Sequence, residues 1–260
     1  MELSSILGII VGVTAVLVGM VFKGANLHAL INPAAFFIII VGTTAALMNA
    51  FPMRQFVKLP TMFGLVFKGK KFADKRDIAR EFVSMSQLVR REGILVLEQH
   101  TESMTDKFMS SGISMVVDGI EPQLIEEVLE SQIEALQERH KLGAQIFAQA
   151  GMCAPTLGVL GAVIGLVAAL GNLSDIERLG HAIAGAFIAT LLGIFTGYVM
   201  WHPFSNKLKQ INREEVEIKR MIVQGILAIQ AGDPPVVVQL KMLAHIREQD
   251  RAVLEKEWAK

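Results

Sequence analysis

The long apolar segments of this sequence hold few side chains that could bind or transfer an ion. Between residues 151 and 203 the two apolar runs and their ends offer only hydroxyls and four other polar groups, Cys153, Asn172, His181 and His202. No charged residue lies inside the two apolar runs of this stretch. A membrane protein that couples an ion gradient to work usually carries an ionisable group within the bilayer. Either this chain moves no ions, or another chain supplies the carboxylate.

A second group of candidate residues is charged and lies in a polar, helical part of the sequence. It comprises Arg90, Arg91, Glu92 and Glu98. Composition alone favours a solvated helix surface. The alternative is a docking face, on which opposite charges steer a partner and set its register.

Motifs for catalysis are missing from the sequence. It has no glycine-rich loop followed by Lys-Ser/Thr, no HExxH and no CxxC. The single cysteine, Cys153, excludes an internal disulfide framework, and we interpret it as a small packing residue. The formal net charge of zero gives no argument for nucleic-acid binding. We therefore expect a protein that is not an enzyme, needs no cofactor and binds no nucleic acid.

The elements that must position these residues are membrane spans. The chain is 52% hydrophobic and 19% charged, against about 25% charged in soluble domains. Four uncharged runs can each hold the roughly 20 residues that cross a bilayer, and we place the spans near residues 3–22, 33–51, 150–171 and 180–201. The first has no basic n-region, which favours a retained anchor over a cleaved signal peptide. The predicted fold is an all-α polytopic membrane protein with four transmembrane helices and a helical cytoplasmic domain.

The basic residues predict the orientation of the spans. Of 25 lysines and arginines, 13 lie between Arg54 and Lys141 and 10 lie after Pro203. Only two remain for the loops 23–32 and 172–179. Because basic loops stay inside, we expect both termini and both large polar regions in the cytoplasm.

This orientation divides the chain into four predicted parts. They are the first two transmembrane helices (1–52), a cytoplasmic helical domain (53–148), the last two transmembrane helices (149–203) and C-terminal cytoplasmic helices (204–260). A long helix is expected to begin at Pro122 and to run into the third span.

Two local patterns bear on the membrane surface and on the second span. After Pro52, apolar residues alternate with basic ones, which suits an amphipathic segment on the inner leaflet near anionic headgroups. Pro60 and Gly64 argue against one long helix there. Thr43 and Thr44 are expected to bond back to helix carbonyls.

Small residues form stripes on the third and fourth spans. On the third they recur at 4-3-4-3-4 spacing at Gly151, Pro155, Gly158, Ala162, Gly165 and Ala169. On the fourth they recur at 4-3-4 spacing at Ala186, Thr190, Gly193 and Gly197, with Thr190 the one hydroxyl. Such stripes let helices approach closely in lipid. Pro155 has no N–H and should kink or soften its helix.

Several runs of the sequence resemble a known family. Four spans with a large loop between the second and third, together with RREGILVLE, APTLGVLGAVIGLVAAL and AFIATLLGIFTGYVMWHPFSNKL, resemble the MotA family of flagellar stator subunits, relatives of ExbB and TolQ. The resemblance extends from the N-terminus to about residue 230. It implies a homopentamer around the paired transmembrane helices of MotB, whose aspartate carries the ion, with cytoplasmic heads that push on the rotor protein FliG.

The resemblance also implies roles for particular residues. Arg90 and Glu98 match the family's rotor-facing charges in the RREGILVLE run. Pro155 and Pro203 match its two prolines at the inner end of the channel helices, where they couple conformational change to the heads. Thr190 matches the threonine of the ion path.

Ala162 bears on the choice of ion. Sodium-driven relatives resemble this sequence at that position but carry threonine, which offers an extra oxygen to a dehydrated cation. Alanine therefore favours proton coupling. In the expected mechanism the partner carboxylate alternates between charged and neutral forms, and the small residues leave room for rotation past it.

Three other functions remain open at this point. They are a sodium-coupled stator, an energiser of an envelope transport system of the ExbB/TolQ type, and a structural membrane scaffold without an ion path. The second typically has three spans, so four predicted spans count against it.

Overall fold

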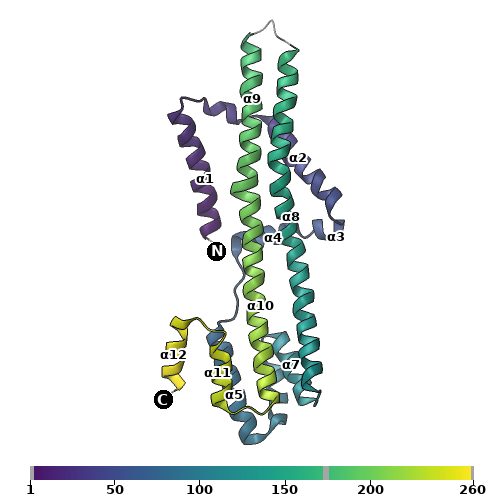
Figure 1. The fold of residues 1–260 in the computed structure, drawn as a ribbon, viewed down its shortest axis with the longest axis vertical. Helices are drawn as coiled ribbons and strands as arrows, with labels where there is room; N and C mark the ends of the chain where they lie inside the picture. The colour runs from purple at the N-terminus through teal and green to yellow at the C-terminus, as the bar shows by residue number, and fades with distance from the viewer. Residues whose placement is uncertain (1–2, 172–175, 259–260) are drawn as a thin grey trace. The chain divides into compact units, whose positions relative to one another are not determined.

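The computed structural model describes residues 3–171 and 176–258, and these residues form helices joined by short connections, with no strand among them (Figure 1). The all-α fold class is confirmed. Asn172 and the first half of the predicted loop 172–179 lie outside the described residues, and its second half is the start of helix α9 (Ile176–Phe195). The chain divides into two compact units: residues 3–70 with 140–211, and residues 71–139 with 212–258. Helices α8 (Pro122–Leu170) and α10 (His202–Gln230) contribute residues to both.

The first unit contains the apolar helices. They are α1 (Leu3–Phe22), η1 (Leu27–Leu30), α2 (Pro33–Ala50), α3 (Met53–Phe56), α4 (Leu59–Lys68), most of α8, α9 (Ile176–Phe195), the π-helical turn η3 (Thr196–Trp201) and the start of α10. Four helical segments are long and apolar enough to cross a membrane: Leu3–Phe22, Leu27–Ala50, Pro122–Leu170 and Ile176–Gln230. This confirms the four predicted spans and the long helix from Pro122.

Sequence patterns account for the helix boundaries here, with two exceptions. Asn32 caps α2 by accepting a hydrogen bond from the Ala35 N–H, and Pro33 occupies the first turn. Pro60 likewise lies in the first turn of α4, but Gly64 lies inside that helix and does not interrupt it. Thr44 donates to the Ile40 carbonyl as expected. The expectation for Thr43 is wrong, because its buried hydroxyl has no hydrogen-bond partner in the described chain.

The second unit is a helical domain with one apolar core. It comprises α5 (Lys75–Glu92), η2 (Ile94–Val96), α6 (Leu97–Ser103), α7 (Lys107–Val117), parts of α8 and α10, α11 (Pro235–Leu243) and α12 (Glu248–Trp258). Amphipathic faces supply the core, and its largest fully buried side chains include Phe82, Ile113, Ile133 and Met221. Asp74 and Asp106 cap α5 and α7, and Gly93 ends α5 at φ 84°, a conformation that favours glycine.

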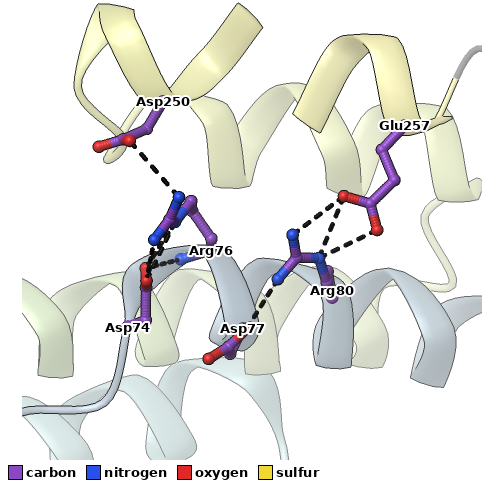
Figure 2. Close-up of polar contacts among 6 residues, drawn as sticks. All are labelled: Asp74, Arg76, Asp77, Arg80, Asp250 and Glu257. Carbon is purple, nitrogen blue, oxygen red and sulfur yellow. Dashed lines mark hydrogen bonds and ion pairs between the residues drawn. The ribbon is translucent and has the colours of Figure 1, made fainter. Parts of the chain in front are cut away.

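Ion pairs connect the C-terminal helix α12 to the first half of α5 (Figure 2). Arg80 donates to both carboxylate oxygens of Glu257, at 3.0–3.3 Å, and also bonds Asp77. Arg76 pairs with Asp74 and approaches Asp250 at 3.8 Å. Beneath these pairs Leu254 is fully buried in the core. The hydrogen bonds from Arg76 hold the pKa of the Asp74 carboxyl below its usual range.

The predicted division into membrane and cytoplasmic parts remains a prediction. The compact units meet at residues 70/71, 139/140 and 211/212, whereas the predicted boundaries follow the ends of the spans. The two differ because the first unit includes helical segments that pack beside the span ends, α4 among them. Packing and membrane position are different criteria.

His245 makes the stability of the second unit depend on pH. Its Nε2 lies 2.5 Å from Gln224 Oε1, and burial lowers its pKa from 6.5; Lys75 lowers it further, while Glu217 opposes the shift. Below that ordinary value the unfolded chain takes up the proton first, so stability is lost as pH falls through 6.5. A Trp201→Phe variant keeps Trp258 as its single tryptophan, and Trp258 packs against the core of the second unit. We expect the melting temperature of this detergent-solubilised variant, followed by the fluorescence of Trp258, to fall as the pH is lowered.

The same measurement on a His245→Gln variant is the control. Its melting temperature should change less between pH 7 and pH 5, because the group that titrates there has been removed. An identical slope in both proteins would show that other groups cause the pH dependence.

Candidate functional site: a close helix hairpin and a charged helix end

Helices α8 and α9 approach each other closely within the first unit, where they lie side by side (Figure 1). A methyl group built on Gly193 would lie 2.7 Å from the Ala154 carbonyl oxygen and 2.9 Å from Gly158 Cα. One built on Gly158 would lie 2.8 Å from the Ala189 carbonyl oxygen. These neighbours are backbone atoms, which cannot rotate away. Only glycine at both positions allows this separation of the helices.

The contacts along the hairpin give its register. Gly158 faces Gly193, Gly161 lies against Ala189, and Gly165 lies against Ala186. The small-residue stripes therefore face each other inside one chain. Close helix packing occupies the space on this side of the glycines, and room for rotation past a partner carboxylate remains a prediction.

Thr190 and Ala162 lie at the same level of the hairpin. Ala162 follows Gly158 by four residues and Thr190 precedes Gly193 by three, so the register brings the two positions to one height. Both side chains are half-buried. Thr190 Oγ1 donates to the Ala186 carbonyl at 3.3 Å. That bond uses the hydroxyl proton and leaves the oxygen able to accept a hydrogen bond.

The fourth span contains a π turn that the sequence patterns did not predict. Residues Thr196–Trp201 form it, and the His202 N–H bonds the Gly197 carbonyl five residues back. Pro203 follows, in the first turn of α10. Proline has no N–H and its ring clashes with the carbonyl four residues before it, so a locally wider helix suits this position. A proline late in a predicted span was the available signal.

Pro155 packs directly against this π turn. A methyl group on Gly197 would lie 2.8 Å from Pro155 Cγ and 2.9 Å from the Gly151 carbonyl oxygen. Thr196 Oγ1 donates to the carbonyls of Leu192 and Gly193 at the start of the turn. Pro155 and Pro203 thus border the same irregular turn, one from the facing helix and one from the following residues.

No group of three or more potential metal ligands occurs among the described residues. Cys153 is half-buried, and Gln149 Nε2 lies 3.6 Å from its sulfur. This environment agrees with a packing role. The closely packed part of the hairpin, residues 158–165 and 182–193, therefore offers the Thr190 hydroxyl and backbone carbonyls to an ion, but no carboxyl or imidazole group that could carry a proton.

The charged end of α5 and the start of α6 form a second candidate site, within the second unit. Arg90 and Glu98 are exposed, and no ion pair or side-chain hydrogen bond engages either one in the described chain. The arginines of the first half of the same helix, Arg76 and Arg80, are instead paired with carboxylates (Figure 2). Leu95 lies between the two free charges in sequence and is 68% exposed. Exposed apolar side chains beside free charges are typical of contact surfaces.

Comparison with known proteins gives consistent matches over most of the chain. Residues 100–221 match the MotA/TolQ/ExbB proton channel family, and residues 6–93 match the family described as motility protein A N-terminal. Motility protein A of Bacillus subtilis is 47% identical over 251 residues, which cover 96% of this chain and 93% of the relative.

Two solved structures share the fold. One is the flagellar MotAB stator complex from Bacillus subtilis, with 46% identity, a TM-score of 0.90, and coverage of 96% of this chain and 98% of the other. The other is MotAB of C. jejuni, with 30% identity, a TM-score of 0.90, and coverage of 95% and 97%.

Proposed function

The chain belongs to the MotA/TolQ/ExbB proton channel family and is a stator subunit of the flagellar motor, and we propose that with a MotB-type partner it conducts protons and converts their flow into torque. The observation that carries the proposal is the α8–α9 hairpin, which is tightly packed and contains no acidic side chain between residues 179 and 206. Such a hairpin can line an ion path only if another chain supplies the titrating group.

MotB is the partner that can supply it. The two structural relatives are complexes of MotA with MotB. In our proposal a homopentamer of this chain surrounds a pair of MotB transmembrane helices in the bacterial inner membrane, with both termini in the cytoplasm. The chain acts as a channel and force-generating subunit, not as an enzyme.

The proposed mechanism depends on one carboxylate that changes charge. In a low-dielectric site its charged form favours hydrogen-bond donors and water, whereas its neutral form tolerates apolar surroundings. Each change alters its preferred contact with the ring of hairpins, of which Thr190 and Ala162 form one level. Pro155 and Pro203 border the π turn, where a helix can change its hydrogen bonding at low cost. We propose that this turn transmits the change to the cytoplasmic domain.

Motility of a stator-null strain tests the function and the choice of ion. The strain should swim when it carries this chain with the MotB of the same organism. A protonophore should stop swimming, and removal of sodium should not. No swimming and no ion flux with MotB would refute the stator function. Swimming that needs sodium would instead establish the sodium-coupled alternative and refute the inference drawn from Ala162.

Arg90 and Glu98 are proposed to contact FliG on the rotor. Arg90→Glu should reduce stall torque by at least about fivefold, because like charges placed opposite each other cost several kcal/mol. Glu98→Lys should act in the same direction. Torque is measured from the rotation of tethered cells or attached beads, and membrane levels of the variants are checked by immunoblot.

Arg247→Glu provides the matched control. Arg247 is an exposed arginine of the same unit, and it lies between α11 and α12, close in sequence to the Asp250 that approaches Arg76. The end of α5 that carries Arg76 is about 20 Å from Arg90, from the rise of about 1.5 Å per helical residue. Equal torque loss in this control, or loss of assembly in the Arg90 variant, would show that the charges at 90 and 98 serve stability and not rotor contact.

A further inference from the structure

The short helices α3 and α4 pack against the ends of all four candidate spans. Ser5, near the start of α1, donates to the Val66 carbonyl of α4 at 3.2 Å. Leu47, near the end of α2, clusters with Phe56 and Leu59. The ring of Phe63 lies 5.0 Å from that of Phe147 on α8.

The fourth span reaches the same level. The ring of Phe63 lies 5.8 Å from Trp201 and 6.2 Å from Phe204, centroid to centroid. Phe67 adds a further edge contact with Phe204 at 5.4 Å. All four spans thus end beside α3 and α4, which places the two helices at one surface of the membrane.

The outer side of these helices combines positive charge with exposed apolar groups. Arg54, Lys58 and Lys68 are exposed, and the described chain gives their side chains no acidic partner. Beside them Met53 is 57% exposed and Val57 is 69% exposed. We call these five residues the basic surface. Lys23 and Arg178 are the only basic residues near the opposite span ends.

This combination identifies the kind of partner. Unpaired lysines and arginines at a membrane surface attract anionic headgroups, and adjacent apolar side chains enter the boundary between headgroups and acyl chains. A soluble acidic protein could pair with the charges, but it could not cover the apolar side chains, because these lie at the depth of the membrane boundary. Zwitterionic lipid would satisfy the apolar groups alone. Anionic phospholipid satisfies both.

We propose that the basic surface binds anionic phospholipid headgroups of the inner leaflet and selects such lipids around the stator. The lipid phosphates pair with Arg54, Lys58 and Lys68, while Met53 and Val57 lie against the upper acyl chains. The proposal is independent of which ion the hairpin conducts.

Tryptophan quenching by brominated lipids tests the proposal. Trp201 belongs to the aromatic cluster that α4 contacts, and a Trp258→Phe change, with the tryptophans of MotB also replaced, leaves it as the reporter. The complex with MotB is reconstituted in phosphatidylcholine vesicles that contain either brominated phosphatidylglycerol or brominated phosphatidylcholine. Each basic side chain near an anionic surface adds about a fivefold preference for anionic lipid. We therefore expect phosphatidylglycerol to associate with the complex at least about fivefold more strongly than phosphatidylcholine.

Salt and charge-neutral variants complete the test. The preference should fall at high salt and should disappear in the triple variant Arg54→Gln, Lys58→Gln, Lys68→Gln. Lys58→Arg with Lys68→Arg should keep it, and so should Lys23→Gln at the opposite end of the spans. Equal quenching by both lipids in the wild-type complex would overturn the proposal, as would an undiminished preference in a correctly assembled triple variant. Neither result of this lipid test bears on the stator function, which is tested separately by the swimming of the complemented stator-null strain.

Discussion

Gly193→Ala should abolish swimming in a stator-null strain complemented with this chain and its MotB. The added methyl group would lie 2.7 Å from the Ala154 carbonyl oxygen and 2.9 Å from Gly158 Cα. Real side-chain carbons do not approach backbone atoms this closely, so α8 and α9 must separate. Overpacking of a well-packed interior costs about 1–3 kcal/mol, and the register that aligns Ala162 with Thr190 would be lost as well.

Gly180→Ala is the matched control for this change. Gly180 lies on the same helix α9, but a methyl group there would meet nothing within 4 Å. The two variants make the same chemical change and alter helix propensity equally. Swimming speed and the amount of stator complex recovered from membranes are compared. Full activity of Gly193→Ala would show that the hairpin tolerates a wider separation, and the close approach would then have no functional importance.

The spacing of small residues predicted that close packing occurs but not where it occurs. A stripe at 4-3-4 spacing identifies one face of a helix, and that face could meet a neighbouring span, a second copy or a partner helix. Intrachain contacts answer the question for Gly158 and Gly193, which face each other. The relation of Thr190 to Ala162 follows from that register, and it could not be derived from either helix alone.

The π turn and Thr43 show why local rules fail inside a bundle. Pro203 was recognised as a feature of the inner span end, yet the wider turn before it depends on how the facing Pro155 and Gly197 accommodate each other. Thr43 could have bonded back to its own helix as Thr44 does, but its buried hydroxyl remains unpaired. In both cases tertiary packing overrides the local preference.

The charged residues of α5 show a similar limit. Arg76, Arg80 and Arg90 all lie on α5, and their residue type alone does not distinguish them. The docking of α12 separates them, because Glu257 and Asp250 approach the first two and leave Arg90 exposed. Such a difference depends on contacts across about 170 residues of sequence. The family resemblance singled out Arg90 as a candidate, and the ion pairs of Arg76 and Arg80 supply a physical reason to distinguish Arg90 from them.

Thr190→Val should reduce proton flux and torque strongly without disrupting assembly. Valine has nearly the shape of threonine, so the half-buried position remains filled. The change removes the one hydroxyl of the α9 stripe, whose oxygen can accept a hydrogen bond while its proton is donated to Ala186. The donor to this oxygen must be water or the protonated partner acid, and such a neutral hydrogen bond contributes about 0.5–1.5 kcal/mol, which corresponds to a factor of about 2 to 10 in rate.

Two further variants separate the role of this hydroxyl from general effects of the substitution. Thr190→Ser should retain most of the flux, since it keeps the oxygen. Thr44→Val is the matched control, because Thr44 also donates to a carbonyl four residues back but lies on α2. Flux is measured as the acidification of cells or vesicles that carry the complex. If Thr190→Val conducts normally, the ion path does not use this hydroxyl, and the hairpin would then contribute only shape and backbone carbonyls to a path whose chemistry belongs to the partner carboxylate.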